Sequence, residues 1–77
     1  MFEHLKIGAM VYAVHNKYVS KKASHGRIQV CRVKTFENKD GEIVPVLTVV
    51  GNSKQELIAA SHSIYISLPD AINAIRN

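Results

Sequence analysis

A tight turn in the middle of the chain most strongly constrains its fold. Residues 38–41 read Asn-Lys-Asp-Gly, and the Asp-Gly pair supplies the positive φ angles that a two-residue hairpin turn requires. Runs rich in β-branched residues flank the turn at residues 27–36 and 43–50. We therefore predict two antiparallel strands joined by this turn. The second run is almost entirely apolar, which indicates a central strand, and Pro45 within it predicts an edge or a bulge on its side.

The strand predicted at residues 27–36 changes the parity of its apolar residues. Ile28 and Val30 occupy even positions, whereas Cys31 and Val33 occupy odd positions. A regular strand cannot bury both sets on one face, because a shift of one residue inverts every side chain. We predict a bulge or sharp bend near Val30 and Cys31, where the strand would pass from one sheet layer to another.

Two segments precede this strand. Residues 6–14 are apolar on both faces and predict a first strand that is covered on both sides. Residues 15–26 form a polar connection that is too long for a tight hairpin turn. Long loops of this kind often carry function. We expect Tyr18 and Val19 to fix the middle of this loop to the body of the domain.

Residues 53–60 admit two interpretations. The letters Ser-Lys-Gln-Glu at residues 53–56 match a helix capping box and favour a helix. The alternative is a short strand after a turn at Gly51. The strand is slightly favoured, because the apolar stretch is too short for a stable helix on its own.

The end of the chain predicts a short strand and a helix. Residues 63–66 predict the strand, with Ile64 and Ile66 facing inward. A helix over about residues 68–76 follows, with Ser67 as its N-cap and Asp70 near the positive end of its dipole. Four apolar residues recur at helical spacing in one stripe, which we expect to close one end of a β-core: Leu68, Ala71, Ile72 and Ile75.

The size of the chain indicates a single domain over residues 1–77. Hydrophobic residues make up 47% and charged residues 21%, the balance of a globular fold. Cys31 is the single cysteine, so no disulfide can form within the chain, and a reducing compartment and a possible homodimer are expected. No apolar run reaches the ~20 residues of a spanning helix, and Glu3 stands where a signal peptide is basic. The expected location is therefore cytoplasmic, with no membrane partner.

The order of these elements resembles that of SH3-like β-barrels. Residues 6–14 and 26–30 are similar to the opening of KOW-type barrels, which have a Gly-x-x-Val strand followed by a Gly-x-Val/Ile strand. Residues 63–72 resemble the ending of many uncharacterised proteins of phages and mobile elements, in which a short strand runs into a capped helix. The resemblance implies a mainly β fold, a small SH3-like barrel of about five strands with a short C-terminal α-helix.

The charged residues are segregated along the chain. There are ten Lys and Arg and six Asp and Glu, a formal net charge of +4, yet residues 4–36 hold seven basic residues and no acid. A one-sided basic surface suits a phosphate backbone, and an aromatic ring among lysines suits base stacking. The alternative is a solvated loop whose lysines provide solubility. The candidate binding face comprises Lys17, Tyr18, Lys21, Lys22, Arg27, Arg32 and Lys34.

Metal and catalytic sites have weaker signals. The four histidines and Cys31 lack the close pairs that structural zinc requires, so no metal and no cofactor are expected. A nucleophilic Cys31 would need an open, electropositive pocket, whereas its apolar neighbours indicate burial. The sequence has no Gly-x-Ser-x-Gly motif, no phosphate-binding glycine loop and no His-Glu-x-x-His motif. We therefore expect a protein that is not an enzyme.

Two functional hypotheses remain. In the first, the chain is a non-enzymatic binding module, of the kind that phages encode, and acts as a protein-interaction or inhibitor domain whose basic face docks on an acidic protein surface. In the second, the basic long loop and the strand after it bind nucleic acid, mainly through its phosphates. The resemblance to mobile-element proteins slightly favours the first hypothesis, and the charge distribution serves both.

Overall fold

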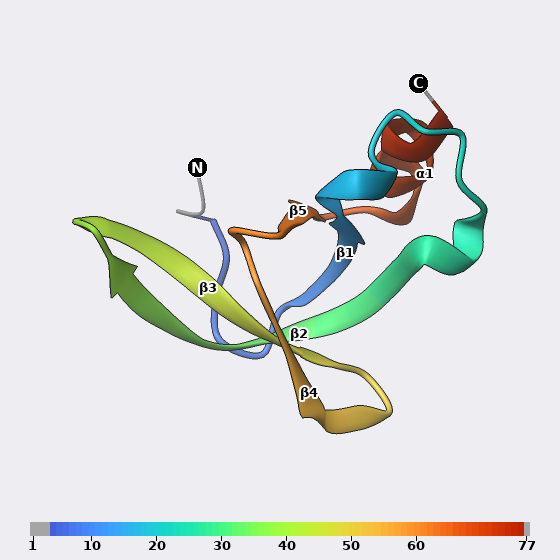
Figure 1. Cartoon of the computed structure of the whole chain (residues 1–77). Coiled ribbons are helices and arrows are strands. Elements are labelled where there is room, and N and C mark those ends of the chain that lie inside the picture. The colour runs from blue at the N-terminus through green and yellow to red at the C-terminus, as the bar shows by residue number, and fades with distance from the viewer. Residues whose placement is uncertain (1–3, 77) are drawn as a thin grey trace.

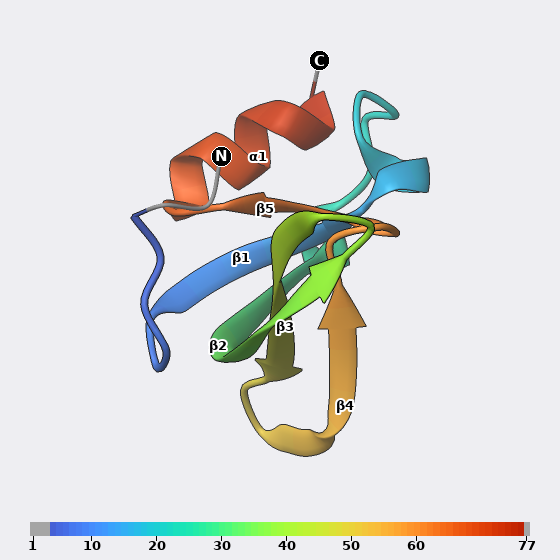
Figure 2. The same cartoon turned by 90° about the vertical axis from the view of Figure 1, so that its left-hand side faces the viewer.

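The computed structural model describes residues 4–76 and contains one antiparallel sheet with a short helix. The strands are β1 (Met10–His15), β2 (Ile28–Lys39), β3 (Glu42–Val49), β4 (Asn52–Ile58) and β5 (His62–Tyr65), in the order β4-β3-β2-β1-β5 (Figures 1 and 2). The mainly β prediction is confirmed. Over the described residues β4 and β5 are the two edges of the sheet, so strand pairing does not close it.

Two apolar clusters cover the two faces of β1. The sheet cluster contains Val11 and Ala13 from β1 together with Cys31, Val33, Leu47 and Leu57. The helix cluster contains Val14 from β1 and two residues of α1 (Leu68–Arg76), Ala71 and Ile75. Because alternate residues of a strand point to opposite faces, β1 contributes to both clusters. The prediction that this strand is covered on both sides is confirmed, although it begins at Met10, later than expected.

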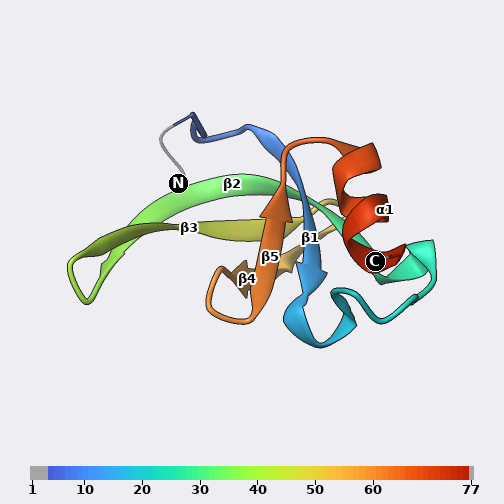
Figure 3. The ribbon, with the colours of Figure 1, turned by 90° about the horizontal axis from the view of Figure 1, so that it is seen from above.

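The bend predicted near Val30 and Cys31 is wrong in position. Pairing of β2 with β1 is regular through both residues, and the register shift against β3 lies between Val33 and Thr35 (Figure 3 shows the long arch of β2). No bend is needed at Val30, because apolar residues cover both faces of β2 at this point. Ile28 packs against the helix cluster, while Cys31 and Val33 lie in the sheet cluster.

The predicted hairpin turn is confirmed. Asp40 and Gly41 have φ angles of 55° and 83° and join β2 to β3, as a two-residue turn of this type requires. The Gly41 amide donates a hydrogen bond to Asn38 Oδ1 at 3.0 Å. Pro45 lies opposite Phe36 of β2 and one residue beyond the last pair between β3 and β4. Proline has no backbone N–H to donate, and because β4 is not paired at this position, no hydrogen bond to β4 is lost.

The ambiguous segment forms strand β4 rather than a helix, as the slightly favoured interpretation predicted. Leu57 is its one buried residue, and it joins the sheet cluster from a position opposite Leu47 of β3. In β5, Ile64 packs against the same cluster as expected. Ile66 is 73% exposed, so its predicted inward position is wrong. The strand ends at Tyr65, and the alternation of faces no longer applies beyond it.

The helix predicted over residues 68–76 is confirmed, and Ser67 caps it by accepting a hydrogen bond from the Asp70 amide. Its C-terminal end is capped by the long loop between β1 and β2. The amides of Ser20 and Lys22, both at positive φ, donate to the carbonyls of Ala74 and Ile75 at 2.7 Å. These bonds satisfy carbonyls that a helix end leaves without partners.

The long loop carries two short 3-10 helices, η1 (Asn16–Tyr18) and η2 (His25–Arg27), one at each end. Tyr18 and Val19 pack against the helix cluster, so the predicted anchoring of the loop is confirmed. The loop and α1 lie together on one side of the sheet (Figure 1). Within residues 4–76, no helix has the length and apolar character to cross a bilayer.

Candidate anion-binding cleft

A polar cleft of about 350 Å³ lies where the long loop meets the ends of four strands. Residues from both 3-10 helices and from strands β1, β2, β4 and β5 line it. No acidic residue is among these lining residues, whereas two histidines, a lysine and an arginine are. The residues that line the cleft are His15, Lys17, Tyr18, Gly26, Arg27, Gln29, Gln55, Leu57 and His62.

Tyr18 brings two cations together in the cleft. Lys17 Nζ lies 5.1 Å and Arg27 Cζ lies 4.7 Å from the centroid of its ring. Both distances are within the range of cation–π attraction. The ring is therefore in contact with the protein's own cations. It also packs against the helix cluster and lies edge-on to the His15 ring, with the centroids 6.3 Å apart. Tyr18 holds Lys17 and Arg27 at the cleft, and the stacking role suggested for its ring stays a prediction.

His15 and His62 face each other across the last pair of the β1–β5 ladder. Their ring centroids are 5.0 Å apart in an edge-to-face arrangement. The Lys17 amide donates to His15 Nδ1 at 3.2 Å, and Ser61 Oγ lies 2.9 Å from His62 Nδ1. Desolvation lowers the pKa of His62, and the charge of His15 lowers it further, while a hydrogen bond with the Ile58 backbone raises it in part.

The seven predicted face residues fall into three groups in the structure. Lys17, Tyr18 and Arg27 meet at the cleft. Lys21 and Lys22 are exposed on the part of the loop that caps α1, where Arg76 occupies the last turn of the helix.

The third group, Arg32 and Lys34, lies farther along β2. Arg32 pairs with Met10 at the start of β1, whereas the cleft lies at the other end of that strand. The Arg32 guanidinium donates to the Gly8 carbonyl at 3.1 Å. Lys34 forms an ion pair with Glu56 of β4. The structure therefore brings three of the seven residues into one site and places the other four elsewhere.

Four polar residues of the cleft were not among the predicted site residues: His15, Gln29, Gln55 and His62. The two histidines are far apart in sequence, and only the register of β5 against β1 brings them together. An alternation of polar residues on short strands does not specify which strands will be neighbours. The sequence therefore does not predict that His15 and His62 will lie together.

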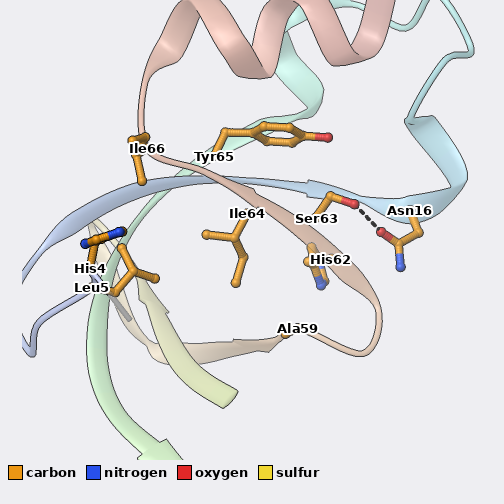
Figure 4. A pocket seen from close by; sticks show the side chains of 9 residues that line it. All are labelled: His4, Leu5, Asn16, Ala59, His62, Ser63, Ile64, Tyr65 and Ile66. Carbon is orange, nitrogen blue, oxygen red and sulfur yellow. Dashed lines mark hydrogen bonds between the residues drawn. The ribbon is translucent and has the colours of Figure 1, made fainter. Parts of the chain in front are cut away.

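A second hollow, of about 400 Å³, follows the outer edge of β5 (Figure 4). It is mostly apolar, and its lining includes Leu5, Ala59 and Ile64. At its polar end, Ser63 Oγ donates to Asn16 Oδ1 at 2.7 Å. His62 lines this hollow as well as the cleft, so it lies between the two.

Cys31 is fully buried in the sheet cluster, and burial raises the pKa of its thiol to about 11. The thiol therefore stays protonated near neutral pH and packs as a small apolar side chain. Across residues 4–76, no three His, Cys, Asp or Glu side chains lie close enough together to hold a metal ion.

Comparisons with protein-family models, with curated proteins and with solved structures found no significant match for this chain. The cleft is therefore interpreted from the chemistry of its own residues.

Proposed function

We propose that the protein is a non-enzymatic binding module whose cleft binds the phosphate backbone of nucleic acid. The observation that carries this proposal is the acid-free cleft in which Tyr18 gathers Lys17 and Arg27 beside two histidines. A guanidinium offers a planar fork of donors that matches phosphate oxygens, and an ammonium adds a point charge. Amide groups of Gln29 and Gln55 add neutral donors to the same lining.

The geometry favours binding that does not depend on base sequence. Contacts to phosphates position a nucleic acid without reading its bases. The Tyr18 ring already contacts two cations, so base stacking on it would have to displace them. Outside the cleft, Lys21, Lys22 and Arg76 add exposed positive charge on the loop and at the end of α1, which would attract further phosphates at longer range.

The fold is also consistent with an SH3-like barrel, which we propose as its nearest architectural class. The support is the order of elements, with five consecutive antiparallel strands, β5 beside β1, and a terminal helix. A fold of this class hosts many functions, so the proposed function depends on the cleft and not on the class. An origin in phages or mobile elements stays a prediction from the sequence.

The salt dependence of binding tests the proposed function. We expect a labelled oligothymidylate to bind the protein with an affinity that falls as salt rises. About three neutralised phosphates on a single strand give a slope of about −2 for log K against log salt. Fluorescence anisotropy over a series of salt concentrations measures this slope. Absence of binding at low salt, or a slope near zero, would contradict the proposal.

A second candidate function is docking on an acidic protein surface, and the surface around Arg32 favours it. Arg32 lines a separate hollow with Val50, and Met10 lies opposite Arg32 on β1. Met10 and Val50 are 44% and 48% exposed. Arginine and methionine are enriched at protein interfaces, where apolar residues surround a few charged ones.

This second candidate makes a distinct prediction. If the Arg32 surface docks on acidic proteins, Arg32→Glu will abolish binding to polyglutamate, used as a model acidic polypeptide, and will leave oligothymidylate binding within about twofold. Arg27→Glu serves as the matched charge reversal in the cleft and should give the opposite pattern. Polyglutamate binding that is unchanged in Arg32→Glu would reject the Arg32 surface as its site.

A further inference from the structure

His62 has an electrostatic environment that a bound anion would change. It faces His15 on β1, and Ser61 lies beside it. It lines the cleft together with Lys17 and Tyr18 on η1, Arg27 on η2 and the neutral Gln55 on β4. On its other side, His4 lines the hollow along the edge of β5. Neither lining contains a carboxylate among residues 4–76, so every charge that faces His62 there is positive or becomes positive on protonation.

The two histidines of the cleft are not equivalent. His15 Nδ1 accepts a hydrogen bond from the Lys17 amide, and this bond caps the start of η1. A proton on that nitrogen would remove the acceptor. His62 Nδ1 forms a hydrogen bond with the hydroxyl of Ser61. Because a hydroxyl can donate or accept, this bond can form with the neutral or the protonated imidazole.

We propose that the cleft binds phosphate together with a proton, and that His62 takes this proton, so that nucleic acid binds more tightly as the pH falls. The inference rests on the proposed function and adds to it a dependence on pH. A phosphate in the cleft places negative charge where the protein has none, which favours the imidazolium form of His62. Because the bound complex then holds more protons than the free partners, acid favours the complex.

The surroundings of His62 in the free protein fit this proposal. Burial and the neighbouring His15 hold the pKa of His62 below the ordinary histidine value, which favours the neutral ring in the absence of ligand. A bound phosphate raises this pKa. The affinity then rises as the pH falls through the interval between the two values, by at most about tenfold per pH unit for one proton.

Oligothymidylate is the probe for this proposal, because neither its phosphodiester groups nor its bases titrate between about pH 5.5 and pH 8. We expect the wild-type protein to bind it at least about fivefold more tightly at the acidic end of this range. His62→Gln should remove most of this difference between the two ends of the pH range. His25→Gln is the matched control, since His25 is exposed on η2, carries the same chemistry and does not line the cleft.

The outcomes separate this inference from the function on which it rests. Absence of binding at every pH would refute the proposed function. Binding with the same affinity at both ends of the range, or a pH dependence that His25→Gln removes and His62→Gln keeps, would overturn the inference alone. If His62→Gln does not fold, an NMR titration of the wild-type His62 ring decides the question. Its pKa must rise when oligothymidylate is added, and an unchanged pKa would refute the inference.

Discussion

Reversal of both cations beside Tyr18, in the variant Lys17→Glu, Arg27→Glu, is expected to lower the affinity for oligothymidylate by at least about 100-fold. Each cation supplies a charged hydrogen bond of about 1.5–3 kcal/mol to a phosphate, so the loss of two amounts to at least about 3 kcal/mol. The new carboxylates also repel the ligand. Fluorescence anisotropy at about 0.15 M salt, where long-range charge is screened, measures the effect. Both side chains are exposed, so the variant should keep the fold of the wild-type chain.

The chain offers a matched control for this reversal. Lys39→Glu, Lys54→Glu changes the net charge by the same amount at two exposed positions, on the hairpin end of β2 and on β4, which do not line the cleft. Because long-range charge alone is screened by salt, this control should bind within about threefold of the wild type. An equal loss of affinity in both variants would show that net charge, and not the cleft, determines binding.

Truncation of Ile75 is expected to produce the largest loss of stability. Ile75 of α1 is fully buried where the helix packs against β1 and the long loop. Replacing a buried isoleucine with alanine costs about 2–5 kcal/mol. Because a domain of this size has a net stability of only about 3–5 kcal/mol, the variant should melt at least about 10 °C lower or fail to fold. Thermal denaturation followed by circular dichroism measures this shift.

Ile66→Ala is the control for Ile75→Ala, since it removes the same atoms from a side chain that is 73% exposed. Its melting temperature should stay within about 2 °C of the wild type, because little apolar area is lost from a buried site. Similar melting temperatures for the two variants would contradict the packing of α1 described above. Hydrogen exchange adds a local measurement, because the Ser20 and Lys22 amides should exchange faster when Ile75 no longer anchors the helix.

Local patterns predicted the elements whose determinants are close in sequence. The Asp40-Gly41 turn depends on backbone angles that only a few residues adopt readily, so this dipeptide was sufficient to predict the turn. The terminal helix was equally local, because its cap at Ser67 and its apolar stripe both lie within a few turns. The bend of β2 was placed wrongly because it depends on what covers each face. The sequence around Val30 could not show that a helix from the other end of the chain covers one of them.

The candidate site was predictable only in part. The acid-free segment directed attention to the long loop, and the structure brings Lys17, Tyr18 and Arg27 together there. Their convergence depends on the fold of the loop, which returns η2 to the side of η1. Alternation in the sequence shows which side chains share one face of a strand, but it does not show which strands will be neighbours in the sheet. His62 and Gln55 could therefore not be assigned to the site from the sequence. Lys34 was predicted on the basic binding face, and in the structure it forms an ion pair with Glu56 of β4.

The hydrogen bonds from the long loop to the end of α1 also have a consequence for the thermodynamics of the proposed phosphate binding. A loop of this length would ordinarily lose conformational entropy when a ligand fixes it. Here η1 is capped by His15, the middle is tied to Ala74 and Ile75, and η2 leads directly into β2. The entropic cost of ordering the loop is therefore met when the domain folds. Lys17 and Arg27 are preorganised at the cleft, and more of their interaction energy is available to hold the ligand.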